Sequence, residues 1–99
     1  MYQIEVIDTT RERVIVICET LLNAKDWIYT QILHAMREDI AISVSYPTMR
    51  EIVSFYDTQL INLDNLDEED CVDAVITTYR SARYHIREYY EPIRTVKTI

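Results

Sequence analysis

The sequence predicts an α+β domain with the element order ββαββα, a two-layer sandwich in which an antiparallel sheet carries two helices on one face. Three observations lead to this prediction. Alternating or β-branched runs open the chain, two longer stretches have the spacing of amphipathic helices, and a short internal similarity relates the two halves. A chain of 99 residues has room for one domain, residues 1–99, and its 48% hydrophobic content is enough to build a core without disulfides.

Two strands are expected first. From Tyr2 to Asp8 apolar and polar side chains alternate, which is typical of a half-buried strand. The run from Arg13 to Glu19 is largely β-branched, a composition that favours strands, and we expect it to lie in the centre of the sheet. The polar residues between the two runs are then a turn.

The first helix is expected from Asn23, a good N-cap residue, to about Arg37. Residues 40–46 alternate again and predict a third strand, which Pro47 ends because proline supplies no backbone N–H to a sheet. The following stretch, residues 49–60, has two interpretations.

Thr48 and Glu51 form a capping-box pattern, which indicates a helix over residues 49–60. The β-branched and aromatic run 52–56 indicates a strand instead. Residues 49–53 resemble residues 10–14, so that both halves of the chain would run strand, turn, strand, helix. We therefore predict a strand.

The second helix is expected to be long and C-terminal. Asp67 is a suitable N-cap, and apolar side chains then recur at helical spacing to about Tyr90, two residues before Pro92. This helix would pack beside the first one on the same face of the sheet.

The chain contains no glycine. Phosphate-binding loops, dinucleotide fingerprints and glycine-flanked nucleophile elbows all require glycine, so these chemistries are excluded. Turns are expected to be longer than two residues and built on type I geometry. His34 and His85 each have too few neighbouring ligands in the sequence for zinc, and we expect no metal, no cofactor and no enzymatic activity.

The formal net charge of −7 disfavours direct binding to nucleic acid or to anionic membranes, and favours basic partners. No apolar run approaches the roughly 20 residues that a membrane span needs, and the first residues have no signal-peptide pattern. We expect a cytoplasmic protein, located in the host cytoplasm if it is viral, with reduced cysteines.

Six acidic residues lie within ten positions, with no basic residue among them. Near a helix N-terminus they could simply complement the helix dipole. The functional alternative is a surface that binds a basic protein, with carboxylates imitating a row of phosphates. These candidate partner-binding residues are Asp64, Asp67, Glu68, Glu69, Asp70 and Asp73.

A second candidate surface is basic. Arg80, Arg83 and Arg87 would share one flank of the predicted C-terminal helix. Carboxylates of the same chain could neutralise them, or an acidic partner could bind there. Tyr84 lies beside them and off the predicted apolar stripe, so we expect it to be an exposed anchor of an interface.

In composition the chain resembles the small inhibitors that phages and other mobile elements encode against nucleases and other DNA-binding proteins of host defence. The resemblance rests on no motif. It implies a non-enzymatic protein of the anti-CRISPR or anti-restriction class that binds and blocks a basic, nucleic-acid-binding protein, in some cases by DNA mimicry. One alternative is a self-associating structural or regulatory homodimer, and another is a small enzyme whose site spans two subunits.

Overall fold

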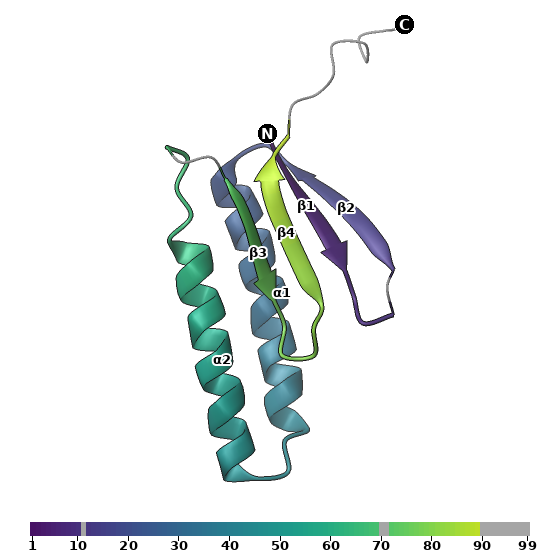
Figure 1. Ribbon diagram of the computed structural model, residues 1–99, viewed down its shortest axis with the longest axis vertical. Coiled ribbons are helices and arrows are strands. Elements are labelled where there is room, and N and C mark those ends of the chain that lie inside the picture. The colour runs from purple at the N-terminus through teal and green to yellow at the C-terminus, as the bar shows by residue number, and fades with distance from the viewer. Residues whose placement is uncertain (11, 70–71, 90–99) are drawn as a thin grey trace, which may run out of the picture.

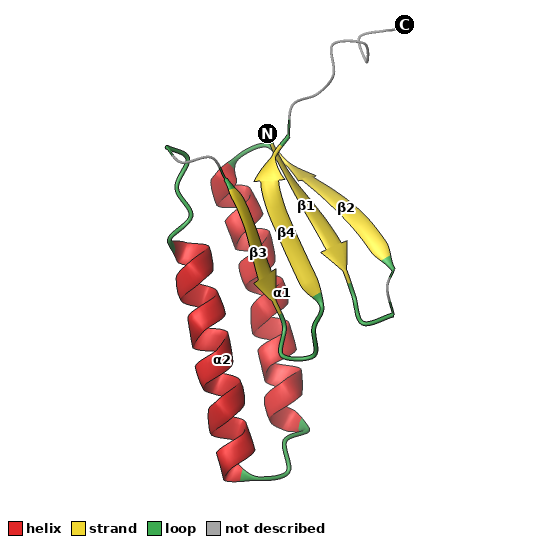
Figure 2. Ribbon diagram, viewed as in Figure 1, coloured by secondary structure: helices red, strands yellow, loops and turns green. Residues whose placement is uncertain are grey.

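The computed structural model describes residues 1–10, 12–69 and 72–89. The chain forms a sheet layer and a helix layer (Figures 1 and 2). The α+β class is confirmed, but the predicted order ββαββα is wrong, because the order is ββααββ. The elements are β1 (Tyr2–Ile7), β2 (Arg13–Cys18), α1 (Leu21–Ala41), α2 (Tyr46–Asp64), β3 (Asp73–Thr77) and β4 (Arg83–Glu88).

The sheet joins two hairpins, one from each end of the described chain. Its order is β2-β1-β4-β3, with every neighbouring pair antiparallel. Ile4 of β1 lies opposite Val16 on one side and Ile86 on the other, which fixes the register of the three strands. Because strand side chains alternate between faces, Ile4 and Ile86 face the helices together.

The core lies between the sheet and the two helices. Ile28 and Ile32 of α1, four residues apart, are fully buried against the sheet, as the helical period requires. Ile52 and Tyr56 of α2 repeat this spacing and are also buried. Burying one isoleucine contributes about 1.5–3 kcal/mol, so this stripe and its sheet partners are the main stabilising feature.

The predicted strand over residues 40–46 is wrong. The helix α1 begins after its N-cap Thr20, whose hydroxyl accepts from the Asn23 N–H, and continues to Ala41. Ile40 packs against the core from the last turn of this helix. A period-2 alternation over so few residues competes weakly with a helix that is already formed.

The predicted strand over residues 49–60 is also wrong, and the helical alternative is correct. Ser45 caps α2 by accepting from the Thr48 N–H, and Pro47 lies in the first turn, where its missing N–H costs nothing. The proline that suggested the end of a strand therefore marks the beginning of a helix.

The predicted long C-terminal helix is absent from the described residues, which form the β3–β4 hairpin there. The apolar residues of this segment fit both the period of a helix and the period of a strand. Ile76, Tyr84 and Ile86 alternate correctly for strands and are buried, whereas Val75 and Tyr79 of the predicted helical stripe are exposed. The parts of that prediction at residues 70–71 and 90 lie outside the described residues.

The turn of this hairpin is built without glycine. The Thr78 N–H donates to the Ala82 carbonyl (2.8 Å), and the Ser81 N–H donates to the Thr78 carbonyl (3.0 Å). Ser81 has φ of 75°, a left-handed conformation that glycine usually supplies. The expectation of turns longer than two residues holds at this hairpin.

The position of β2 differs from the prediction of a central strand. It forms one edge of the sheet, and Val14, Ile15 and Ile17 are 45–53% exposed. No helix among the described residues has the length and apolarity to cross a membrane.

Candidate functional site

A groove with a volume of about 660 Å³ lies at the surface between α1 and α2. Each helix contributes three exposed side chains at positions i, i+4 and i+7, which share one helical face. These six residues are Leu22, Asp26 and Tyr29 from α1, and Asp57, Ile61 and Asp64 from α2. We call this feature the acidic groove.

The acidic groove presents large, mainly apolar side chains at the surface. Leu22 is 65% exposed, Ile61 is 60% exposed and Tyr29 is 47% exposed. Large apolar side chains that are exposed next to one another, and rimmed by polar groups, mark sites of protein–protein contact.

The rim of the acidic groove carries three carboxylates that have no ion-pair partner among the described residues: Asp26, Asp57 and Asp64. Lys25 is the basic residue of the groove, but its Nζ donates to the backbone carbonyls of Asp64 (2.9 Å) and Leu66 (3.0 Å). The two carbonyls lie at the C-terminus of α2 and just beyond it. There the last backbone C=O groups have no N–H donor within the helix. Lys25 is therefore engaged with the backbone, and the rim keeps its negative charge.

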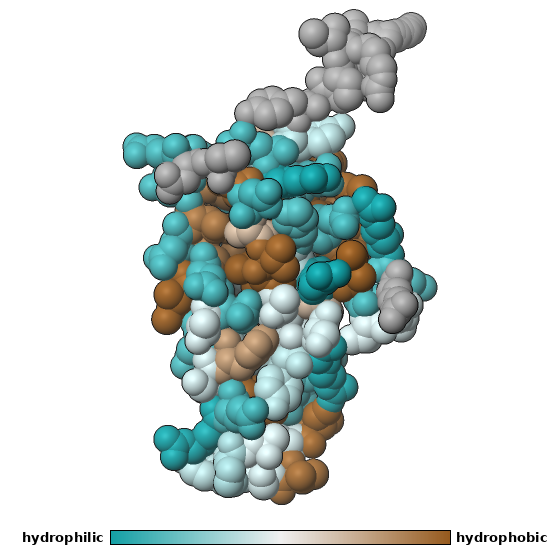
Figure 3. Space-filling view, viewed as in Figure 1, coloured by the Kyte–Doolittle hydropathy of each residue, from teal (hydrophilic) through white to brown (hydrophobic). Residues whose placement is uncertain are grey.

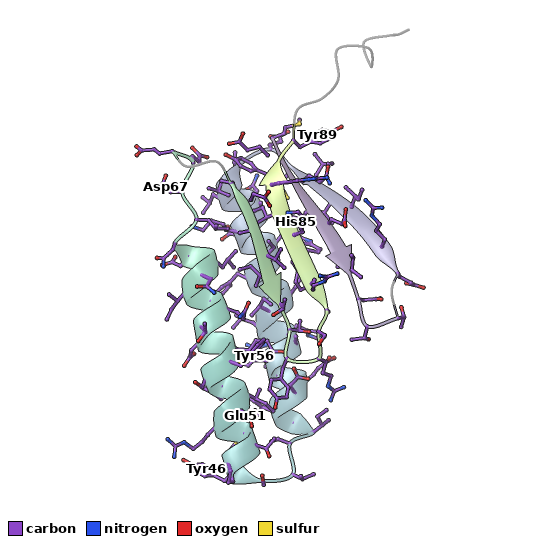
Figure 4. All side chains as sticks on the ribbon, viewed as in Figure 1. Tyr46, Glu51, Tyr56, Asp67, His85 and Tyr89 are labelled. Carbon is purple, nitrogen blue, oxygen red and sulfur yellow. The ribbon has the colours of Figure 1, made fainter. Side chains whose placement is uncertain are left out.

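The acidic loop, residues 65–69, continues the rim beyond α2. Asp67, Glu68 and Glu69 are exposed in it, and the Asp67 Oδ1 accepts from the Glu69 N–H at 3.0 Å. Figure 4 shows Asp67 at the end of the molecule opposite Tyr46.

The expectation that these acids cap a helix N-terminus is wrong. They follow the C-terminus of α2, the end of the helix dipole at which negative charge is unfavourable. Helix stabilisation therefore does not account for the charge of the acidic loop.

The remaining two predicted acids are not part of this feature. Asp73 begins β3 and pairs with His85 on the opposite face of the sheet from the helices. Asp70 lies outside the described residues.

The three arginines do not form one surface. Arg80 lies in the β3–β4 turn, and its Nε is 3.0 Å from the Oδ1 of Asp39, so a carboxylate of the same chain neutralises it. Arg83 and Arg87 are exposed on the open face of the sheet, the face without helices.

Arg80 belongs to a partly buried network. Asp39 is 5% exposed and accepts from the Tyr56 hydroxyl, while the Tyr56 oxygen accepts from the Tyr79 N–H at 2.9 Å. Burial and the bond to Asp39 raise the pKa of Tyr56 above its ordinary value of 10.0. Figure 4 shows Tyr56 at the level of the β3–β4 turn, where this network joins the helices to the sheet.

Tyr84 was expected to be exposed, but it is buried at 8% exposure. Its ring lies edge-on to Trp27, with the ring centroids 6.0 Å apart and an interplanar angle of 71°. Burial raises the pKa of its hydroxyl. Tyr84 therefore stabilises the contact between α1 and β4 and does not form part of an exposed surface.

The open face of the sheet is mixed in character. Arg13 and Glu5 form an ion pair there at 2.7 Å, and Val75 is 49% exposed. Figure 3 shows apolar side chains interspersed with hydrophilic ones over the strands. A small cavity of about 110 Å³ on this face is lined by Glu5, Ile7, Val75, Arg83 and His85.

The described residues contain no group of three or more His, Cys, Asp or Glu side chains placed to share a metal ion. Burial raises the pKa of the Cys18 thiol, which lowers the thiolate fraction at neutral pH.

Sequence reasoning missed five groove residues, because the strand predicted over residues 49–60 hid the second helix. The sequence does contain a signal for the groove, because residues 22, 26 and 29 and residues 57, 61 and 64 have the same i, i+4, i+7 spacing. The missed residues are Leu22, Asp26, Tyr29, Asp57 and Ile61.

Comparisons of the chain with family models, with curated proteins and with solved structures find no match. We therefore infer its function from the acidic groove and the acidic loop.

Proposed function

We propose that this protein is a non-enzymatic binding protein whose acidic groove takes a basic amphipathic segment of another protein and blocks that protein's contact with nucleic acid. One observation carries the proposal: an exposed apolar groove has a carboxylate rim with no ion-pair partner in the described parts of the chain.

The groove suits an amphipathic helix. Such a helix lays its apolar face into a hydrophobic groove with anchors at i, i+3, i+4 and i+7. Leu22, Tyr29 and Ile61 would contact the apolar anchors. Lysines and arginines flanking those anchors would then reach Asp26 on one helix and Asp57 on the other.

Basic segments are the usual means by which proteins hold nucleic-acid backbones. The carboxylates of the groove and of the acidic loop offer such a segment a row of negative charges, in competition with phosphates. The net charge of −7 would also steer a basic partner toward this protein. An inhibitor of the anti-CRISPR or anti-restriction class, acting in the cytoplasm of a host cell, is the role that we propose.

The first test is a calorimetric titration with two synthetic peptides of equal charge. One is an amphipathic leucine–lysine helix, and the other is a lysine peptide with no apolar face. We expect the amphipathic peptide to bind more tightly. We expect the variant Asp57→Lys/Asp64→Lys to weaken its binding at least about tenfold, equivalent to about 1.4 kcal/mol.

The matched control is Glu12→Lys/Glu38→Lys. It makes the same change in net charge at two exposed acids outside the groove, and should change the affinity less than about twofold. Equal weakening by both variants would show that only net charge matters and would contradict the groove. Equal binding of the two peptides would contradict the amphipathic partner.

The natural partner can be captured from a nuclease-treated lysate by the tagged protein and identified by mass spectrometry. The proposal expects a basic protein that handles nucleic acid, and expects added DNA to displace it. The Asp57→Lys/Asp64→Lys variant should fail to capture that protein, whereas Glu12→Lys/Glu38→Lys should retain it.

A further inference from the structure

The strand β2 has the sequence of an interior strand and the position of an edge strand. Its residues 14–17 are Val-Ile-Val-Ile, without proline or lysine. Proteins usually protect edge strands with charges, prolines, bulges or a covering element, because an unprotected edge pairs with other strands. Figure 2 shows β2 at the edge of the sheet with no described element beyond it.

The hydrogen-bonding groups that point outward can be assigned from the turn between β1 and β2. The Asp8 N–H donates to the Glu12 carbonyl, so residues 8 and 12 form a hydrogen-bonded pair of the ladder. Such pairs alternate along antiparallel strands. With the observed register, Val14, Val16 and Cys18 direct their backbone groups to β1. Residues 13, 15 and 17 of β2 therefore direct theirs outward, and Glu19 follows directly after the strand.

A second copy of the same edge satisfies these outward groups. In a two-fold symmetric antiparallel pair, one register sets Val16 opposite Val16 of the second copy. Ile15 then lies opposite Ile17, and Arg13 lies opposite Glu19, in each case between copies. Ile15 and Ile17, whose backbone groups point outward, face one another on both sides of the axis, so the ladder can continue.

The charges at the ends of the strand match in this register. Arg13 pairs with Glu5 of its own copy at 2.7 Å, but its side chain remains 62% exposed, and Glu19, directly after β2, is also exposed. The two-fold axis forms the Arg13–Glu19 pair twice, once at each end of the contact. Opposite charges directly across a ladder stabilise it, and like charges destabilise it.

The apolar side chains match as well. On the open face, Ile15 at 50% exposure would cover Ile17 of the second copy at 45% exposure. On the helix side, Val14 at 53% exposure would lie next to Cys18. Cross-strand pairs of β-branched residues are a main source of stability in sheets. The contact removes from water the exposed apolar side chains that the edge position leaves.

We propose that the protein forms a symmetric homodimer in which the β2 strands of two copies pair antiparallel about a two-fold axis through Val16. The axis is perpendicular to the sheet, so the sheet continues from one copy into the other with all helices on one side. The proposal does not depend on the proposed partner, because the acidic groove lies between α1 and α2, away from β2.

Sedimentation equilibrium of the full chain is the first test. The wild-type protein should sediment as a dimer at micromolar concentration. Ile17→Lys should raise the dissociation constant of the dimer at least about tenfold. Val75→Lys is the matched control, because Val75 is as exposed and lies on the same open face, but on the opposite edge strand β3. It should leave the dimer unchanged.

A charge exchange tests the register. Glu19→Arg places arginines opposite one another at both ends of the contact and should weaken the dimer. Arg13→Glu/Glu19→Arg restores opposite charges between the copies and should bind more tightly than Glu19→Arg alone, although it loses the Arg13–Glu5 pair within each copy. Circular dichroism of each variant confirms that the monomer remains folded, so that a loss of folding is distinguished from a loss of pairing.

Cross-linking tests the axis. In a variant with Cys18 and Cys71 replaced by serine, Val16→Cys brings two Cα atoms to about 4.5 Å across the axis, within the reach of a disulfide. Mild oxidation with diamide should give a covalent dimer. Ile15→Cys in the same background should give no covalent dimer. Residue 15 of one copy lies opposite residue 17 of the other, so the two introduced cysteines do not face each other.

A wild-type protein that remains monomeric at about 100 µM would overturn the dimer and leave the β2 edge to a strand of another protein. A dimer that resists Ile17→Lys, or one that Val75→Lys dissociates, would overturn the β2 contact. Covalent dimers from Ile15→Cys but not from Val16→Cys would overturn the register.

Discussion

The two edges of the sheet are treated differently. At the β3 edge the Thr77 N–H donates to the Gln59 Oε1 of α2 at 3.0 Å, so a helix of the same chain occupies an outward backbone group. At the β2 edge no described element takes this role, and Ile15 and Ile17 are exposed. The difference teaches that a helix of the same chain satisfies one outward backbone group of the β3 edge, whereas no described element satisfies any at the β2 edge.

The polar contacts near the two edges differ in the same way. On the β3 side, Asp39 is buried and holds both Tyr56 and Arg80. On the β2 side, Arg13 and Glu5 form an ion pair on the surface. Removing one member of a buried set leaves polar groups without partners, whereas an exposed pair loses little because water replaces it.

The largest expected effect follows from this contrast. Asp39→Ala should lower the free energy of unfolding by about 3 kcal/mol, because Tyr56 and Arg80 both lose their acceptor. The control Glu5→Ala, at the exposed pair, should cost less than about 1 kcal/mol. Urea denaturation of both variants measures the difference, and equal losses would contradict the distinction between the two sides.

A pH titration sharpens the same comparison. The folded-state pKa of Tyr56 lies above its ordinary value of 10.0, chiefly through burial, so the folded state keeps this proton more tightly than the unfolded state. Its contribution to stability is fully present below pH 10 and is lost as the pH rises further, by up to about 1.4 kcal/mol per pH unit. Thermal unfolding followed from about pH 8 to about pH 11, on both sides of the ordinary tyrosine pKa, should show this loss of stability.

The control for the titration is Tyr56→Phe, which removes this group's proton. The variant should be less stable than the wild type at neutral pH. Its free energy of unfolding should decrease less steeply above pH 10. Burial also raises the pKa of Tyr2 and Tyr84, so some alkaline loss should remain in the variant. An identical slope in both proteins would show that Tyr56 does not govern the alkaline limit.

The smallest expected effect is that of Gln59→Ala. The Thr77 N–H would lose its acceptor, at a cost of about 1 kcal/mol. Amide hydrogen exchange should then be faster at Thr77 and approach the rates of Ile15 and Ile17 in the dilute protein. Unchanged protection at Thr77 would mean that packing of α2, and not the Gln59 side chain, closes this edge.

The first three elements could be predicted, apart from the edge position of β2 and the last turn of α1, because their local signals agree. The β1 run alternates, the β2 run is β-branched and a polar turn separates them, while the apolar spacing of α1 indicates a helix up to about Arg37. In α2 the β-branched Ile52 and Val53 favour a strand locally, yet tertiary packing of Ile52 and Tyr56 overrides that preference. Pro47 was ambiguous because it ends strands and begins helices.

The last hairpin could not be predicted from local pattern. Val72 and Ile76 fit both a helix and a strand, and the usual turn signal was missing because Ser81 occupies the left-handed position in place of glycine. The acidic loop was found from its charge alone. The acidic groove could not be predicted, because Asp26 and Asp57 form one rim only when α1 and α2 lie side by side.

The contact between Trp27 and Tyr84 gives this protein a built-in optical reporter. The chain has one tryptophan, and its ring lies half-buried between α1 and β4, where the helix layer meets the sheet. Its fluorescence emission should shift to longer wavelength when the two layers separate and water reaches the indole. Folding can therefore be followed without a label, at a position that lies in neither the acidic groove nor the β2 edge.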